Sequence, residues 1–147
     1  MQFEHFVAGT VLRAGPRAVG DEEIVEFARR YDPQPFHVDR ERAATSRWGG
    51  LIASGWMTCG IAMELAVEHI LKGSESIGSP GIDELRWENP VRPGDQLMLT
   101  ITVLESRRSS SGRTGVVRWR WELHNQEAKP VLSLLATSLF DVADPTA

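Results

Sequence analysis

The sequence predicts an α+β fold, in which an antiparallel sheet curls around one long central helix. From residue 56 to residue 71 almost every position is apolar, as expected for a helix that is buried on most of its sides. Strand-like segments then follow one another from residue 82 to residue 140 with no helix between them. Helices grouped before a run of strands are typical of the α+β class.

The composition is that of one compact domain, which we expect to span residues 1–147. The chain is 41% hydrophobic and 24% charged, values that are usual for a globular protein. Its net charge of -4 offers no basic surface to nucleic-acid phosphates, so we expect no nucleic-acid partner. The single cysteine, Cys59, excludes an intramolecular disulfide and favours a reducing compartment, by default the cytoplasm.

Neither the first residues of the chain nor its longest apolar stretch indicates a membrane protein. The first 20 residues lack the basic start, apolar core and cleavage site of a secretory signal. The longest apolar stretch, residues 51–67, is slightly short for a bilayer span and contains Ser54, Thr58 and Glu64. We therefore expect no membrane partner and interpret this stretch as part of the buried helix.

Three helices are expected before the strands. Residues 21–32 begin with three acids and repeat apolar side chains at helical spacing, and Pro33 ends the pattern. A short helix follows from the N-cap Asp39 through residue 45, before Gly49 and Gly50. The central helix covers residues 56–71, and its only polar stripe consists of Glu64, Glu68 and Lys72.

The strands are expected at residues 82–87, 96–105, 115–124 and 131–140. The third of these segments alternates apolar with polar residues, the period of a sheet with one face on the core. Its inward set is Val117, Trp119, Trp121 and Leu123. Residues 106–113 are predicted to form a solvated hairpin loop, and residues 125–130 the last hairpin.

The segment YDPQPFH, residues 31–37, places two prolines between an acid and a histidine. Pro33 and Pro35 fix their own φ and push Asp32 and Gln34 toward extended conformations, so that the segment forms a rigid loop. Taken alone, such a pattern is more often a turn than a catalytic site. Two titratable groups held at a fixed separation are nevertheless what acid-base catalysis on one water molecule requires.

The stretch FARRYDPQPFHVDRERAATSRWGGLIASGWMT resembles the MaoC-like, or hydratase 2, branch of the hot-dog fold. The segments FVAGT and RWENPVRPGDQL support the resemblance, which covers most of the chain. It implies hydration of a trans-2-enoyl thioester of coenzyme A or acyl carrier protein to the (R)-3-hydroxyacyl thioester, and the reverse dehydration. It also implies a homodimer or a dimer of related halves.

Matched to the family motif, Asp32 is the catalytic aspartate, His37 the catalytic histidine and Gly55 the backbone donor to the thioester carbonyl. Gln34 replaces the asparagine that is common in the motif. Unpaired N–H groups at the start of the central helix suit this third role, with Ser54 as the N-cap. Substrate contacts are expected from Gln34, Ser54 and Trp56. No step requires a cofactor, and the scattered histidines indicate no metal site.

Two other functions fit the same fold. A hot-dog acyl-CoA thioesterase would direct a carboxylate-activated water at the carbonyl carbon and release free thiol. A non-catalytic acyl-binding or scaffold subunit would keep the fold without needing both Asp32 and His37. Because exposed sheet edges need covering, we also predict a homodimer in which two sheets meet edge to edge.

Overall fold

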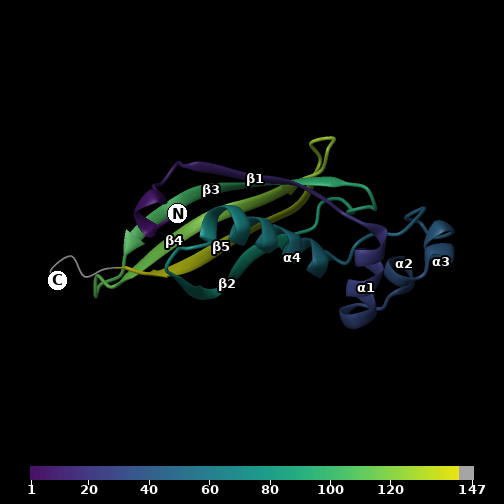
Figure 1. The fold of residues 1–147 in the computed structure, drawn as a ribbon, viewed down its shortest axis with the longest axis horizontal. Coiled ribbons are helices and arrows are strands. Elements are labelled where there is room, and N and C mark those ends of the chain that lie inside the picture. Colours follow the sequence, from purple (N-terminus) through teal and green to yellow (C-terminus); the bar gives the residue numbers. More distant parts are fainter. Residues whose placement is uncertain (143–147) are drawn as a thin grey trace.

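The computed structural model describes residues 1–142 as an antiparallel sheet with one long helix packed across it (Figure 1). The sheet has five strands in the order β1-β3-β4-β5-β2. Their bounds are Val11–Ala18 for β1, Ser76–Arg86 for β2, Gln96–Arg108 for β3, Thr114–His124 for β4 and Pro130–Asp141 for β5. The strands β1 and β2 therefore form the two edges of the sheet.

The helices fall into two groups. Three of them, α1 (Asp21–Tyr31), α2 (Pro35–Val38) and α3 (Arg40–Ala44), gather at one end of the molecule, whereas α4 (Gly55–Ala66) lies over the sheet (Figure 1). A short π-helical turn, η2 (Val67–Leu71), extends α4, and a 3-10 turn, η1 (Phe3–His5), begins the chain. No helix within residues 1–142 is long and apolar enough to cross a membrane.

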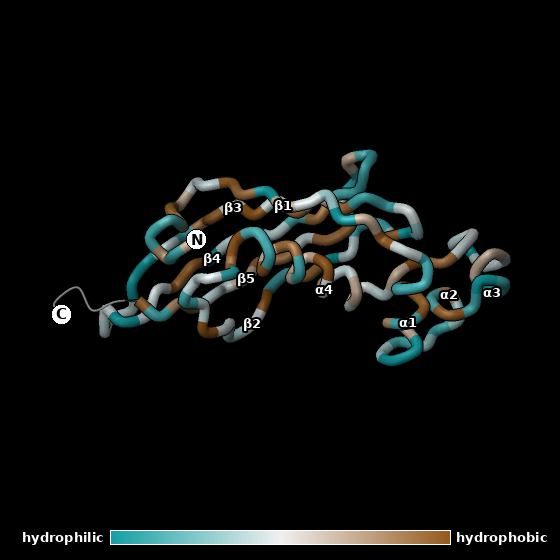
Figure 2. The backbone as a smooth tube through the Cα atoms, viewed as in Figure 1, coloured by the Kyte–Doolittle hydropathy of each residue, from teal (hydrophilic) through white to brown (hydrophobic). Residues whose placement is uncertain are grey.

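The core lies between α4 and the face of the sheet toward it. Figure 2 shows apolar segments concentrated where α4 meets the central strands. The predicted inward set of β4 is confirmed, because all four side chains are at most 5% exposed: Val117, Trp119, Trp121 and Leu123. The indole N–H of Trp119 donates to the Ser138 hydroxyl at 3.1 Å, so this large side chain is buried with its polar atom satisfied.

The sheet is larger than the sequence pattern predicted. The pattern gave no strand before residue 21, and β2 begins at residue 76 and not at residue 82. Both segments contain glycine and proline, which weaken a strand signal. In β1, Gly15 has a φ of +121°, and a Cβ there would lie 2.8 Å from the Leu97 carbonyl oxygen of β3. Long-range pairing therefore forms these strands despite their composition.

The central helix is less enclosed than predicted. Its polar stripe was expected to be the only exposed part, but Trp56 is 59%, Met63 47% and Val67 41% exposed. These residues follow one another at the spacing of a single helix face, opposite the buried Ile61 and Leu65. The sequence pattern did not distinguish the two cases, because an apolar residue on a helix can face the sheet or a surface that another molecule covers.

Candidate active site

The segment that carries Asp32 and His37 has the backbone that its prolines dictate. Helix α1 ends at Tyr31, and Asp32 has left the helical conformation, with φ -155° and ψ 65°, but is not extended. Gln34 is extended, with φ -77° and ψ 146°, so the predicted extended conformation is confirmed at Gln34 and not at Asp32. His37, however, does not lie in a loop. Pro35 occupies the first position of the short helix α2, which proline favours, and α2 carries the histidine.

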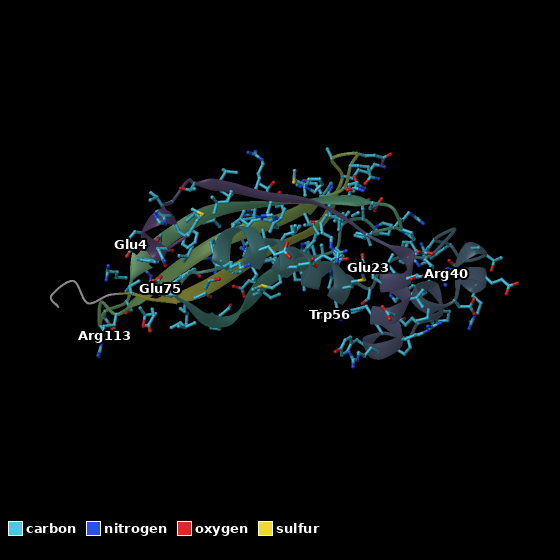
Figure 3. All side chains as sticks on the ribbon, in the orientation of Figure 1. Glu4, Glu23, Arg40, Trp56, Glu75 and Arg113 are labelled. Carbon is cyan, nitrogen blue, oxygen red and sulfur yellow. The ribbon has the colours of Figure 1, made fainter. Side chains whose placement is uncertain are left out.

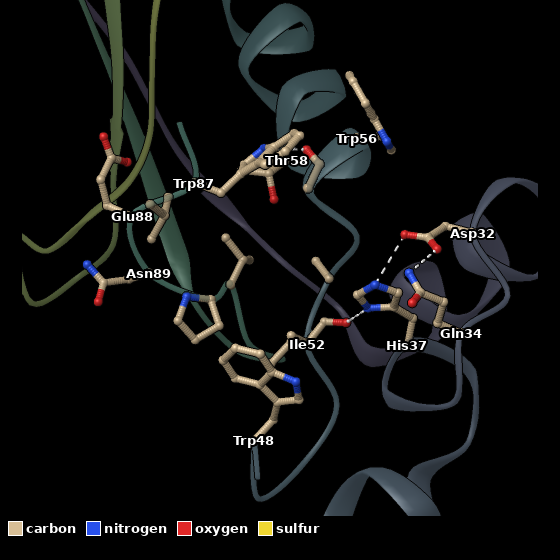
Figure 4. Close-up of a pocket in the computed structure, with 15 residues that line it drawn as sticks. Asp32, Gln34, His37, Trp48, Ile52, Trp56, Thr58, Trp87, Glu88 and Asn89 are labelled. Atoms are coloured by element: carbon tan, nitrogen blue, oxygen red, sulfur yellow. Dashed lines mark hydrogen bonds and ion pairs between the residues drawn. The ribbon is translucent and has the colours of Figure 1, made fainter. Parts of the chain in front are cut away.

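The side chains of Asp32 and His37 meet across this turn (Figure 4). His37 Nε2 lies 3.2 Å from Asp32 Oδ2. On the other side of the ring, His37 Nδ1 lies 2.6 Å from the Ile52 carbonyl oxygen. Because a carbonyl oxygen can only accept a hydrogen bond, Nδ1 carries a proton and donates it there. Nε2 is then the nitrogen directed at the carboxylate, and the histidine is 4% exposed.

Polar neighbours keep Asp32 ionised. Burial raises the pKa of the Asp32 carboxyl, but hydrogen bonds from Gln34 and Ser54 and the contact with His37 outweigh it, so the pKa lies below its usual value. The Gln34 amide donates to Asp32 Oδ1 at 2.7 Å. The predicted substrate contact Gln34 thus holds the acid directly. At neutral pH the carboxylate is an acceptor for a proton.

The lowered pKa of Asp32 predicts a pH-dependent effect of Gln34 on stability. An unfolded Asp has a pKa of about 3.9, so the stability from Asp32 is complete above that value and is lost as pH falls through the lower folded pKa. Gln34→Ala should therefore destabilise the protein at neutral pH, with the difference from wild type shrinking between about pH 5 and pH 1. Urea unfolding measures this, with exposed Gln96→Ala as control. A difference that stays constant with pH would contradict the assignment.

The start of α4 forms the opposite wall of the site. Ser54 is fully buried, and its hydroxyl accepts from the Trp56 N–H at 3.3 Å, which confirms its predicted N-cap position. Among the described residues no acceptor pairs with the Gly55 N–H. The indole N–H of Trp87 donates to the Gly55 carbonyl at 3.0 Å. A Cβ at Gly55 would lie only 2.4 Å from the Trp87 ring, so this wall requires glycine.

These two walls enclose a pocket of about 410 Å³ (Figure 4). Five of the six predicted site residues line it, namely Asp32, Gln34, His37, Gly55 and Trp56. Ser54 does not line it but supports the wall from behind. The structure adds residues that the sequence pattern missed, among them Trp48, Ile52, Thr58, Trp87 and Asn89. The only signal for Trp87 was its place within RWENPVRPGDQL.

Figure 3 shows the side chains of the described residues, with Trp56 at the end of α4 that faces the helices α1 to α3. The pocket therefore opens where the helical end of the molecule meets the sheet. A family model described as the MaoC-like domain matches residues 3–122, which include both walls of this pocket. The chain belongs to the MaoC-like domain family.

Known proteins resemble this MaoC-like chain over nearly its whole length. A crystal structure of the MaoC-like dehydratase from Rhodospirillum rubrum is 36% identical, with a TM-score of 0.86, and the match covers 96% of this chain and 97% of that one. The "Uncharacterized protein YdeM" of Bacillus subtilis is 30% identical over 127 residues, 86% of this chain and 89% of its own.

The R-hydratase PhaJ1 from Pseudomonas aeruginosa has the same fold, with a TM-score of 0.76 at 23% identity, over 97% of this chain and 91% of its own. Together with the antiparallel sheet around α4, these similarities confirm the predicted hot-dog fold of the MaoC-like chain.

Proposed function

We propose that this MaoC-like protein adds water to a trans-2-enoyl thioester, yielding the (R)-3-hydroxyacyl thioester, and also catalyses the reverse dehydration. The observation that carries the proposal is the contact of His37 Nε2 with Asp32 Oδ2 in a pocket that also contains Gly55. The R-hydratase that has the same fold supports hydration with (R) stereochemistry. Coenzyme A and acyl carrier protein are both suitable carriers.

In the proposed reaction the ionised Asp32 takes a proton from water while the water oxygen forms a bond to C3. The Nε2–H of His37 gives a proton to C2, which saturates the double bond. The Gly55 N–H, at the positive end of α4, stabilises the negative charge that develops on the thioester oxygen. A proton then passes from Asp32 to His37 across their 3.2 Å contact and restores the starting state.

The Asp32–His37 pair suits these roles because each partner is held by other groups. The Ile52 carbonyl fixes the orientation of the His37 ring, and Gln34 and Ser54 hold the Asp32 carboxylate. Positioned groups matter because an error of about one ångström can cost roughly a hundredfold in rate. The substrate carbonyl is expected at the Gly55 N–H, with Trp56 and Trp87 beside the acyl group.

The test is a spectrophotometric assay on the purified protein with trans-2-enoyl-CoA substrates of four to ten carbons. We expect the absorbance of the conjugated double bond to fall without release of free thiol. The stereochemistry of the product is then read by a dehydrogenase specific for (R)-3-hydroxyacyl thioesters. Release of free thiol would instead indicate a thioesterase, and no change in either signal would indicate a binding or scaffold subunit.

We further propose that residues 1–147 form one domain that acts as a homodimer. All described strands share one sheet, which supports the single domain. The edge strand β2 is exposed along almost its whole length, and Ile82 on it lies with Met63 of α4 in one apolar hollow. Pairing this edge with a second copy would satisfy its backbone groups.

The dimer predicts a mass in solution of twice the 16.4 kDa of one chain, measured by light scattering. Ile82→Lys should shift the mass toward the single chain, because it places a charge on the unpaired edge. Val7→Lys is the matched control, since Val7 is 61% exposed and lies outside β2 and α4. A wild-type mass equal to one chain would show that the dimer is wrong.

A further inference from the structure

Trp87 occupies a position between two hollows. It follows β2 directly and lines the catalytic pocket, where its indole N–H holds the Gly55 carbonyl at 3.0 Å. The same side chain is a hydrogen-bond partner of the Cys59 thiol, one helical turn further along α4. Cys59 does not line the catalytic pocket but a second hollow next to it. The indole therefore lines the catalytic pocket and contacts the wall of the second hollow through Cys59.

The second hollow is apolar and has a volume of about 290 Å³. Its wall comes from α4, η2 and the strands β2, β4 and β5. The large side chains in it are Met63, Leu71, Ile82, Trp121 and Leu134. No charged side chain lines it among the described residues. Such a surface suits a hydrocarbon chain, because its polar groups within residues 1–142 are limited to three serines and the Trp121 indole N–H, and none carries a positive charge for a phosphate or a carboxylate.

The two hollows are consecutive along the same elements. On α4, Gly55 and Thr58 line the catalytic pocket, and Cys59 and Met63 line the second hollow. On β5, Val131 lines the first and later residues line the second. A chain that extended from a thioester at Gly55 along α4 would consequently meet the Trp87 ring before it reached the second hollow.

We propose that Trp87 determines acyl-chain length, by separating the catalytic pocket from the apolar hollow and so restricting the enzyme to short-chain 2-enoyl thioesters. The inference rests on the proposed hydratase function and adds its substrate class. Trp56 packs edge-on against Trp87 with ring centroids 5.2 Å apart, and the hydrogen bond to Gly55 fixes the other side of the indole. Trp87 is thus held in place on two sides although it is 44% exposed.

The specificity for acyl-chain length depends on how many methylene groups of the substrate are buried. Each methylene that enters an apolar pocket is worth about fourfold or more in a specificity constant. With Trp87 in place, the carbons beyond the catalytic pocket gain no such burial. With a smaller side chain at position 87, they can enter the second hollow and contact Met63 and Leu134.

The experiment compares kcat/KM for trans-2-enoyl-CoAs of four, six, eight and ten carbons in wild type, Trp87→Phe and Trp87→Leu. We expect wild type to be fastest with four carbons and to decline with length. Trp87→Leu should raise the ratio of the eight-carbon to the four-carbon substrate by at least about tenfold. Trp87→Phe is the matched control: it keeps a ring against Gly55 while removing the N–H, so its ratio should stay near that of wild type.

A double variant tests where the added carbons lie. Met63→Trp in the Trp87→Leu background fills the second hollow and should return the ratio of the eight-carbon to the four-carbon substrate to near its wild-type value. Wild-type activity that is equal for four and ten carbons would overturn the role of Trp87, even if the variants failed to fold. So would an unchanged ratio in Trp87→Leu. Absence of turnover at every length would overturn the hydratase function itself, and this proposal with it.

Discussion

Asp32→Asn and His37→Ala are each expected to lower kcat for enoyl thioester hydration by about 10²- to 10⁴-fold, with a much smaller effect on KM. Asparagine has nearly the shape of aspartate but cannot take the proton of the attacking water. Alanine at position 37 removes the Nε2 that protonates C2. Because the two side chains touch at 3.2 Å and exchange a proton in the proposed cycle, the double variant should be hardly slower than either single variant.

Matched controls separate this effect from a general loss of structure. Asp83→Asn and His69→Ala change the same residue types at exposed positions outside the pocket, so both should keep the wild-type rate. Circular dichroism and urea unfolding establish that the site variants fold. Folded Asp32→Asn and His37→Ala proteins with full activity would show that the pair has no catalytic role.

Gly55→Ala should lower kcat by about 10²- to 10³-fold, the cost of removing one donor to a developing oxyanion. The added methyl group would lie 2.4 Å from the Trp87 ring, so either the indole or the first turn of α4 must move. Either movement breaks the hydrogen bond from the Trp87 indole to the carbonyl of residue 55 and displaces the N–H of the same residue. Stability should also fall, by about 1–3 kcal/mol, as in other overpacked sites.

Gly60→Ala is the control within the same helix. Nothing lies within 4 Å of a Cβ at Gly60, and alanine favours a helix over glycine by about 0.5–1 kcal/mol. Gly60→Ala should therefore keep the wild-type kcat and unfold at a slightly higher urea concentration. If Gly55→Ala behaved in the same way as Gly60→Ala, the carbonyl could not depend on the Gly55 N–H.

Local signals allowed the sequence to predict the framework that carries the site. The acids at residues 21–23, the apolar repeat and Pro33 placed α1 within one residue of its observed end at Tyr31. Asp39 caps α3 by accepting from the Arg42 N–H, as its position predicted. The alternation in β4 gave its buried face correctly. Each of these features depends on residues that are close in sequence.

The remaining parts of the site depend on contacts between distant segments. Trp87 and Gly55 are 32 residues apart, and nothing near RWENP indicates that its tryptophan holds the start of α4. His37 is oriented by the carbonyl of Ile52, a backbone atom that no side-chain motif can reveal. The strand β1 forms through its pairing with β3 although it contains Gly15 and Pro16. The resemblance to a family supplied the site residues, whereas spacing alone left a turn as the simpler interpretation.

The most direct test of the acid-base pair beside α4 is to follow the oxygen of the added water. The protein is incubated with trans-2-butenoyl-CoA in water enriched in oxygen-18, and the products are analysed by mass spectrometry. We expect one heavy oxygen in the 3-hydroxyl group of an intact thioester, and at least about a hundredfold less of this product from Asp32→Asn in the same time. Heavy oxygen in a free carboxylate, with release of coenzyme A, would mean that the water attacks the carbonyl carbon and would contradict the hydratase account.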